Sequence, residues 1–522
     1  MTPTLSYLDV AADLGRRLVG EAYWAGDMCG WMGWGWSTDG FRPVPAFQAI
    51  GNDVGMGGAG IGLFLAEIGN ATGDVMMLAA ARGALKAAST QARSEGGFFA
   101  GGPGIAATLV LGGRLLDEKS LATAGQDALS AIESSRTFSL YDGAAGAIAA
   151  ILMAGGDLDK AVELASDLIK RGTRDGDALS WSNMLDQPHP NLVGLAHGTD
   201  GIAMVLAALG KATGDTAFYD AANSALAYTA RSFDKARGLW SDNRIGASAP
   251  HLAAAEHARF PVAWEHGATG IALSRTALVR SLPDREATRK ELARALEAVM
   301  AVTQPGPMMQ QDFSVAAGLA GQGEALFEAQ RLGQEGVGQR LDAIAAYGVN
   351  AVLLSRMPWP TAAPNRQPTP SILTGYAGIG RFYLRLHSPD EYPPLLCPIP
   401  YEIAKRSKRT AESASAVDAD ETKGAKTAAS HKPDAKSKAK PKPKAAASRA
   451  KPKASPSKPK PKTSASKAKA KSTPAKAEPK DEPEQSSDEK ESASEIAKKR
   501  ASRPPRPRTE PPMPRQPMGD DE

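Results

Sequence analysis

Titratable residues stand directly before glycine-rich turns at several points in this sequence. Asp142, His197 and His266 each precede the first glycine of a Gly-x-x-Gly turn, and Glu265 stands beside His266. Histidine exchanges protons near neutral pH, and nearby carboxylates shift its pKa or join it in binding a hard metal ion. If the turns meet in space, these side chains form one site for acid–base or metal chemistry.

The Gly-x-x-Gly turn occurs seven times, and apolar residues follow it at helical spacing. After the first turn, Ile61, Phe64, Leu65 and Ile68 fall on one face of a helix. Successive turns begin 42 to 69 residues apart, which leaves room for two helices and their connections. The first glycines of the turns are Gly57, Gly101, Gly143, Gly198, Gly267, Gly318 and Gly375.

These repeats predict an all-α protein built from helix hairpins. One hairpin cannot bury its apolar face alone, so consecutive hairpins must stack as an open solenoid or close into a ring. Closure would place all seven turns at one mouth. Glycine suits that position because it accepts positive φ and lets backbone segments crowd together.

Composition divides the chain into residues 1–400 and residues 401–522. The second part holds 31 Lys and Arg against 18 Asp and Glu, so it carries +13 of a chain whose net charge is +5, and the first part carries −8. The second part also has no aromatic residue after Tyr401 and consists largely of Lys, Pro, Ala and Ser. We expect it to be disordered and to contact nucleic acid or another polyanion without reading sequence.

The two cysteines, Cys29 and Cys397, are far apart and predict neither a disulfide framework nor a Cys-based zinc knuckle. The N-terminus lacks a signal-peptide pattern, and no uncharged apolar run approaches the length of a transmembrane segment. We therefore expect a soluble, cytoplasmic protein.

Several stretches together resemble the lanthionine synthetase C-like (LanC-like) family. They are 53–65 (DVGMGGAGIGLFL), 192–202 (LVGLAHGTDGI), 263–271 (AWEHGATGI), 372–379 (ILTGYAGI) and a Trp-rich entry around residues 28–31. The resemblance covers about residues 5–390 and implies an α/α toroid of seven inner and seven outer helices.

In that family, a thiol adds to a dehydroalanine or dehydrobutyrine, usually within one peptide, and forms a thioether ring. The family's zinc ligands are two Cys and one His, but the matching positions here are Glu265, Ala316 and Ala317. The alanines have no donor atoms, so we expect neither the family's zinc site nor stoichiometric zinc, and no other cofactor is implied.

By resemblance, His197 is the general acid that protonates the enolate. Because a free thiol is mostly protonated at neutral pH when no metal binds it, an active enzyme also needs a base such as His266 or Glu265. Asp142, Trp264 and Glu265 are candidates for substrate contacts. Structural alternatives remain open: His197 caps a loop, Asp142 is an N-cap, and Glu265 with His266 is the inactive remnant of a metal site.

The N-terminal tryptophans Trp24, Trp31, Trp34 and Trp36 either line a peptide or sugar surface or, as we prefer, pack the N-terminus against the toroid.

The functional prediction is a divergent LanC-like protein that adds thiols to dehydroamino acids in a peptide without the usual zinc. One alternative is an inactive scaffold that binds a peptide or protein partner in its cavity and a polyanion through the basic tail. Another is a carbohydrate-active toroid enzyme.

Overall fold

The computed structural model describes residues 5–38, 42–182, 190–244 and 260–402. Contacts divide the chain into two units, Met1–Ala429 and Ser430–Glu522. The second unit, and with it nearly all of the basic tail predicted for residues 401–522, lies outside the described residues.

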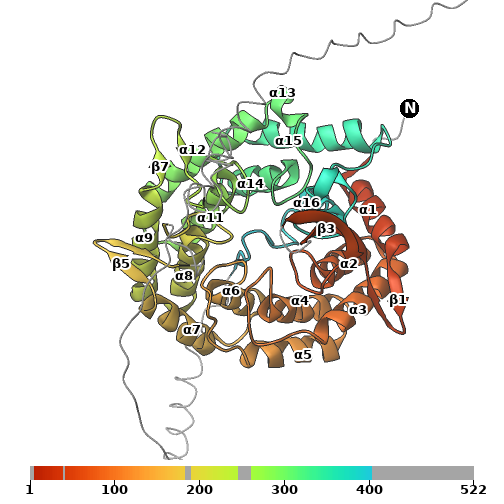
Figure 1. The fold of residues 1–522 in the computed structure, drawn as a ribbon, viewed down its shortest axis with the longest axis horizontal. Coiled ribbons are helices and arrows are strands. Elements are labelled where there is room, and N and C mark those ends of the chain that lie inside the picture. Colours follow the sequence, from red (N-terminus) through yellow and green to blue (C-terminus); the bar gives the residue numbers. More distant parts are fainter. Residues whose placement is uncertain (1–4, 39–41, 183–189, 245–259, 403–522) are drawn as a thin grey trace, which may run out of the picture. The chain divides into compact units, whose positions relative to one another are not determined.

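Within the described residues, seven helices form a closed inner ring (Figure 1). Each packs against the next, and the last returns to the first. Each begins directly after the first glycine of a Gly-x-x-Gly turn, which serves as its N-cap. The inner helices are α2 (Gly58–Thr72), α4 (Gly102–Leu115), α6 (Ala144–Ala154), α8 (Thr199–Thr213), α11 (Ala268–Ser281), α14 (Leu319–Arg331) and α16 (Tyr376–His387).

A second layer of seven helices covers the inner ring, and each outer helix pairs with one inner helix. The first of them in the sequence pairs with α16, which joins the two ends of the fold. The predicted α/α toroid is therefore confirmed. The outer helices are α1 (Tyr7–Glu21), α3 (Val75–Ser89), α5 (Lys119–Ser130), α7 (Leu158–Lys170), α9 (Thr216–Ala230), α12 (Glu286–Val302) and α15 (Gly338–Tyr347).

The two layers differ in composition because they differ in burial. Every residue of α6 is buried, whereas α7 buries only one face, as expected for a core helix and an amphipathic surface helix. Shorter elements fill the connections, and in the described ranges no helix combines the length and apolarity needed to cross a bilayer. The short helices are α13 (Pro305–Met308), η1 (Gly348–Leu353) and η2 (Pro364–Arg366), and the four antiparallel hairpins are β1 (Tyr23–Ala25) with β2 (Met28–Gly30), β3 (Met32–Thr38) with β4 (Pro43–Ala49), β5 (Thr173–Asp175) with β6 (Ala178–Ser180), and β7 (Phe233–Asp234) with β8 (Leu239–Trp240).

Close backbone packing explains the second glycine of each turn. A Cβ at Gly60 would lie 2.0 Å from the carbonyl oxygen of Val54, six residues earlier, and the same approach recurs at all seven turns at 1.7 to 2.2 Å. The expectation that crowding requires glycine is thus met. Positive φ explains less than the sequence suggested, because among the first glycines only Gly101 and Gly267 adopt it.

Backbone hydrogen bonds join the seven turns into a circle at the mouth. At six turns the donor is the residue two positions before the first glycine, and at the fifth turn it is Trp264, one position earlier. Because the circle closes, the side chains that follow on each turn hold fixed positions relative to one another. The N–H to carbonyl pairs are Gly55 to Phe99, Phe99 to Tyr141, Tyr141 to Ala196, Ala196 to Glu265, Trp264 to Ala316, Ala316 to Leu373 and Leu373 to Gly55, at 2.9 to 3.3 Å.

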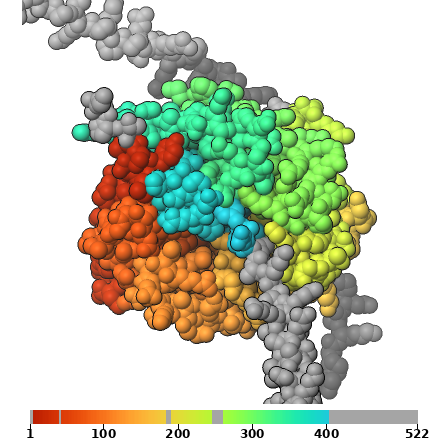
Figure 2. Space-filling model, turned by 180° about the vertical axis from the view of Figure 1, so that it is seen from behind, coloured from red at the N-terminus to blue at the C-terminus, as the bar shows by residue number. Residues whose placement is uncertain are grey.

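The C-terminal segment 392–401 fills the inside of the ring. Leu395, Leu396 and Cys397 are buried, and in the view from behind the last described residues lie at the centre of the ring (Figure 2). Two buried arginines of α16 hold the segment: Arg381 donates to the Pro393 carbonyl (2.9 Å), and Arg385 donates to the carbonyl of Tyr392 (3.1 Å). The ring is thus a packed core, not an open channel.

The N-terminal tryptophans differ in burial. Trp31 is fully buried, and its indole donates to the carbonyl of Leu18 (2.8 Å), so it packs helix α1 as preferred. Trp36 is 60% exposed on the β3–β4 hairpin, where Trp34 packs against Phe47. Packing of the N-terminus therefore does not account for Trp36.

Candidate functional site

Two imidazoles and a carboxylate meet at the mouth where the fourth and fifth turns lie side by side. The rings of His197 and His266 stack with their centroids 5.4 Å apart and their planes inclined by 15°. One ligand atom from each of His197, Glu265 and His266 lies within 4.8 Å of the other two. The structure thus brings together three of the four titratable residues that the sequence placed at the turns.

Burial makes both imidazoles harder to protonate. It lowers the pKa of His266 to about 3, and the Arg244 guanidinium acts in the same direction. Burial also lowers the pKa of His197, but the carboxylates of Glu265 and Asp142 oppose that shift. The surroundings therefore stabilise the protonated form of His197 better than that of His266.

Tyr141, on the third turn, packs against His197 and was not identified from the sequence. Its ring centroid is 4.7 Å from that of His197 and 6.0 Å from that of Phe99. Burial, followed by the carboxylates of Asp53 and Glu265, raises the pKa of the phenol. Tyr141 therefore stays protonated and can donate a hydrogen bond at this site.

Asp242 and Arg244, which follow strand β8, were also missed. The buried Asp242 carboxylate accepts hydrogen bonds from Nη2 (2.8 Å) and the backbone N–H (3.0 Å) of Arg244. Burial alone would raise the pKa of Asp242, but the hydrogen bonds and the charge of Arg244 hold it below its usual value. Both residues lie outside the Gly-x-x-Gly turns, so no repeat signal could have revealed them.

Asp142 lies at the third turn, where it lines a cavity of about 770 Å³ over the first three turns. The N-cap interpretation of Asp142 is wrong, because Gly143 is the N-cap of α6 and no side chain caps it. Instead, the Asp142 carboxylate accepts a hydrogen bond from the Ser139 hydroxyl (2.5 Å) within its own turn. Asp142 therefore lines the cavity and also acts on His197 through its charge.

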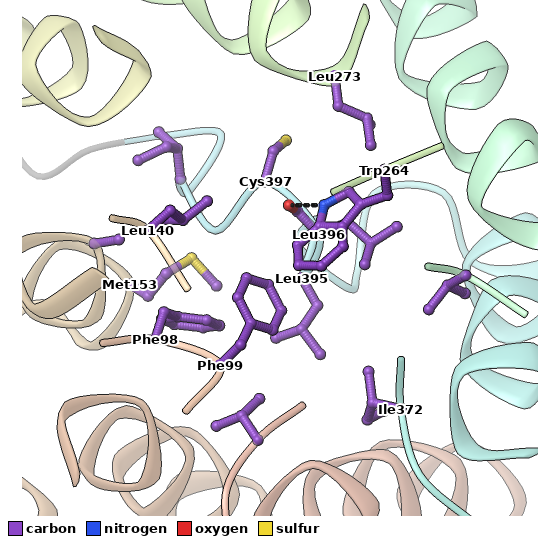
Figure 3. Close-up of a cluster of buried hydrophobic side chains, with 14 of the residues drawn as sticks. Phe98, Phe99, Leu140, Met153, Trp264, Leu273, Ile372, Leu395, Leu396 and Cys397 are labelled. Atoms are coloured by element: carbon purple, nitrogen blue, oxygen red, sulfur yellow. Dashed lines mark hydrogen bonds between the residues drawn. The ribbon is translucent and has the colours of Figure 1, made fainter. Parts of the chain in front are cut away.

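Trp264 lies in the packed centre of the ring, beside Leu396 and Phe99 (Figure 3). It is fully buried, its indole N–H donates to the carbonyl of Leu396 (2.9 Å), and its ring packs edge-on against Phe99 at 4.7 Å. The indole is thus engaged by the protein itself. Trp264 is therefore not available for the substrate contact that was expected of it. We propose instead that it supports the neighbouring turn, which carries Glu265 and His266.

The residues present do not fit the zinc site that the resemblance implies. Ala316 is buried and hydrogen-bonded through its backbone to the fifth and seventh turns, and Ala317 next to it is exposed. Neither side chain has a donor atom, and Glu265 alone cannot hold zinc. In the described part of the chain, the one set of metal-binding groups that converges is His197, Glu265 and His266.

The comparisons with known proteins agree with this architecture. A nisin cyclase of known structure superposes with a TM-score of 0.50 at 16% identity, covering 66% of this chain and 92% of that one. A polysaccharide lyase, BACCELL_00875, covers 65% and 88% at 13% identity, but its TM-score of 0.35 is too low to support an argument. No curated protein sequence matches. The family model for lanthionine synthetase C-like proteins matches residues 48–397, and the chain belongs to this family.

Proposed function

We propose that this protein binds a peptide at the mouth of the toroid and adds a thiol to a dehydroalanine or dehydrobutyrine residue. The observation that carries the proposal is the convergence of His197, Glu265 and His266 close to the cavity bordered by Asp142. The cavity holds the peptide, Asp142 contacts it, and Glu265 faces the reacting thiol. Membership of the LanC-like family supports the peptide as substrate.

The reaction moves one proton and needs no redox partner. The thiol loses its proton, sulfur bonds to the β-carbon as the double bond opens, and the resulting enolate is protonated on its α-carbon. We assign the proton delivery to His197, whose imidazolium Glu265 and Asp142 stabilise, and the proton uptake to Glu265. His266 is a poor base because its pKa is about 3, so its role is to position His197 by stacking.

The basic tail gives the second part of the proposal, because residues 423–476 carry 18 Lys and Arg and a single acid. We propose that the tail holds a polyanion such as nucleic acid through phosphate contacts.

Both cysteines are free and buried, which suits a reducing compartment and therefore the cytoplasm.

An inactive peptide-binding scaffold is the second candidate, because Ala316 and Ala317 have replaced ligands on which the family's catalysis depends. The carbohydrate alternative gains little support, since none of the residues found to line the cavity is aromatic.

The test uses a dehydroalanine peptide with an added thiol, followed by mass spectrometry, and thiol alkylation for rings that form without a mass change. Replacing His197 by Asn should slow addition by roughly 10² or more. Replacing His266 by Asn should cost less. The matched control is His387→Asn, at the exposed far end of α16. If wild-type protein shows no rate above background with peptides or glutathione, the enzyme proposal fails and the scaffold candidate replaces it.

A further inference from the structure

His266 is a buried polar side chain that lacks hydrogen bonds. Its exposed fraction is 3%, and neither Nδ1 nor Nε2 makes a hydrogen bond of good geometry, although the Val193 backbone lies close enough to favour the protonated ring. Buried polar groups in proteins are nearly always paired, and an unpaired one calls for an explanation such as an ion that completes the site. The two ring nitrogens of His266 therefore identify a place where a ligand is needed.

The surroundings of His266 are closed on one side and rich in donors on another. Gly194, at φ +103°, packs against the turn so closely that a Cβ there would lie 2.8 Å from the Glu265 carbonyl and 3.6 Å from Nδ1. The His197 and Glu265 donor atoms lie within 4.8 Å of that of His266. The carboxylates of Asp142 and Asp242 add negative charge near the histidines, and one cation, Arg244, opposes it.

Two imidazoles and one carboxylate form a donor set that zinc, cobalt and nickel ions accept. With bonds of about 2.0–2.1 Å, tetrahedral donors lie about 3.4 Å apart. The present spacing, within 4.8 Å, must shorten to reach that value. The exposed side of the cluster leaves room for water or substrate as a fourth ligand, because His197 and Glu265 are only partly buried.

We propose that His197, Glu265 and His266 form a binding site for one divalent cation of the zinc, cobalt and nickel class. This ligand set differs from the two Cys and one His of the family. It also revises the expectation of a protein without stoichiometric zinc, and it takes up the metal chemistry that the sequence left open for the titratable residues at the turns. The carboxylate that replaces a family cysteine keeps one ligand in place, and the two histidines replace the donors that are lost at Ala316 and Ala317.

One consequence rests on the proposed function. A cation bound to His197 occupies the nitrogen that would carry the proton, so the cation-loaded and proton-transferring forms exclude each other. Cation binding would then switch off thiol addition through His197.

The experiment titrates Zn²⁺ and Co²⁺ into full-length protein stripped with a chelator, by calorimetry and by the visible absorption of bound Co²⁺. We expect one cation per chain, and about 100-fold or greater loss of affinity in Glu265→Gln and His266→Asn. The control His387→Asn should bind like the wild type. Because Glu265 is partly exposed, Glu265→Gln keeps the test valid even if His266→Asn folds poorly, which circular dichroism would reveal.

Absence of a stoichiometric site in wild-type protein, or equal binding by Glu265→Gln, would overturn the cation site and leave the proposed function standing. A bound cation together with no thiol addition by the stripped protein would instead overturn the proposed function and leave the cation site standing. If both are right, the stripped protein is active and Zn²⁺ inhibits it.

Discussion

Replacing Trp264 by Phe should weaken the fold and also disturb the functional site. The change removes the indole N–H that donates to the Leu396 carbonyl at 2.9 Å, and both groups are buried. An unpaired buried carbonyl costs about 1–3 kcal/mol, and the space left by the smaller ring adds to this, so we expect a loss of about 2–4 kcal/mol. Because Trp264 directly precedes Glu265 and His266, the turn that carries them should become less well positioned.

Trp181 provides a matched control. It is equally buried, and its indole donates to the carbonyl of Leu168 at 2.8 Å, but it lies beside strand β6 and helix α7 in the outer layer. Urea unfolding should show a similar loss of stability for Trp264→Phe and Trp181→Phe.

Thiol addition and Co²⁺ affinity, measured well below the unfolding transition, should fall for Trp264→Phe and stay near wild type for Trp181→Phe. Two outcomes would refute the idea that the C-terminal segment supports the site through Trp264. In the first, both variants lose stability equally and neither changes the site. In the second, Trp181→Phe impairs the site as much as Trp264→Phe does.

Three further outcomes are expected. Limited proteolysis should leave a stable fragment that ends near residue 402, and a stable fragment that extends past about residue 430 would contradict this boundary. A chain shortened to residue 391 should not fold stably, because it lacks the segment that Arg381 and Arg385 hold. Replacing Glu67 by Ala should cost about 3–5 kcal/mol in denaturant unfolding, because the buried Arg381 guanidinium loses both of its 2.8 Å contacts to that carboxylate. Full-length protein should bind DNA with a steep salt dependence and little sequence preference, and deletion of residues 402–522 should abolish binding; retention of binding by the truncated protein would refute the role of the tail.

The repeats alone predicted the toroid because each one carries its own local signal. Gly-x-x-Gly followed by a helical apolar pattern marks the start of every inner helix, and the seven repeats are too interdependent to fold separately. The same register predicted that His197 and His266 lie at one mouth, since equivalent positions in a closed ring face the same way. The glycines themselves were expected for crowding, and the approach of Gly60 to the Val54 carbonyl supplies the physical reason.

The partners of those histidines depended on contacts between residues distant in sequence. Asp242 and Arg244 reach the mouth from a hairpin outside the repeat, and Tyr141 meets His197 because adjacent turns hydrogen-bond to each other.

Trp264 looked like a mouth residue by its position, but it points inward because the C-terminal segment, 132 residues later, supplies a carbonyl for its indole. The sequence by itself thus determined which turns meet. The tertiary structure decided which way each side chain points, because that depends on the packing and hydrogen-bond partners that chain closure brings from elsewhere.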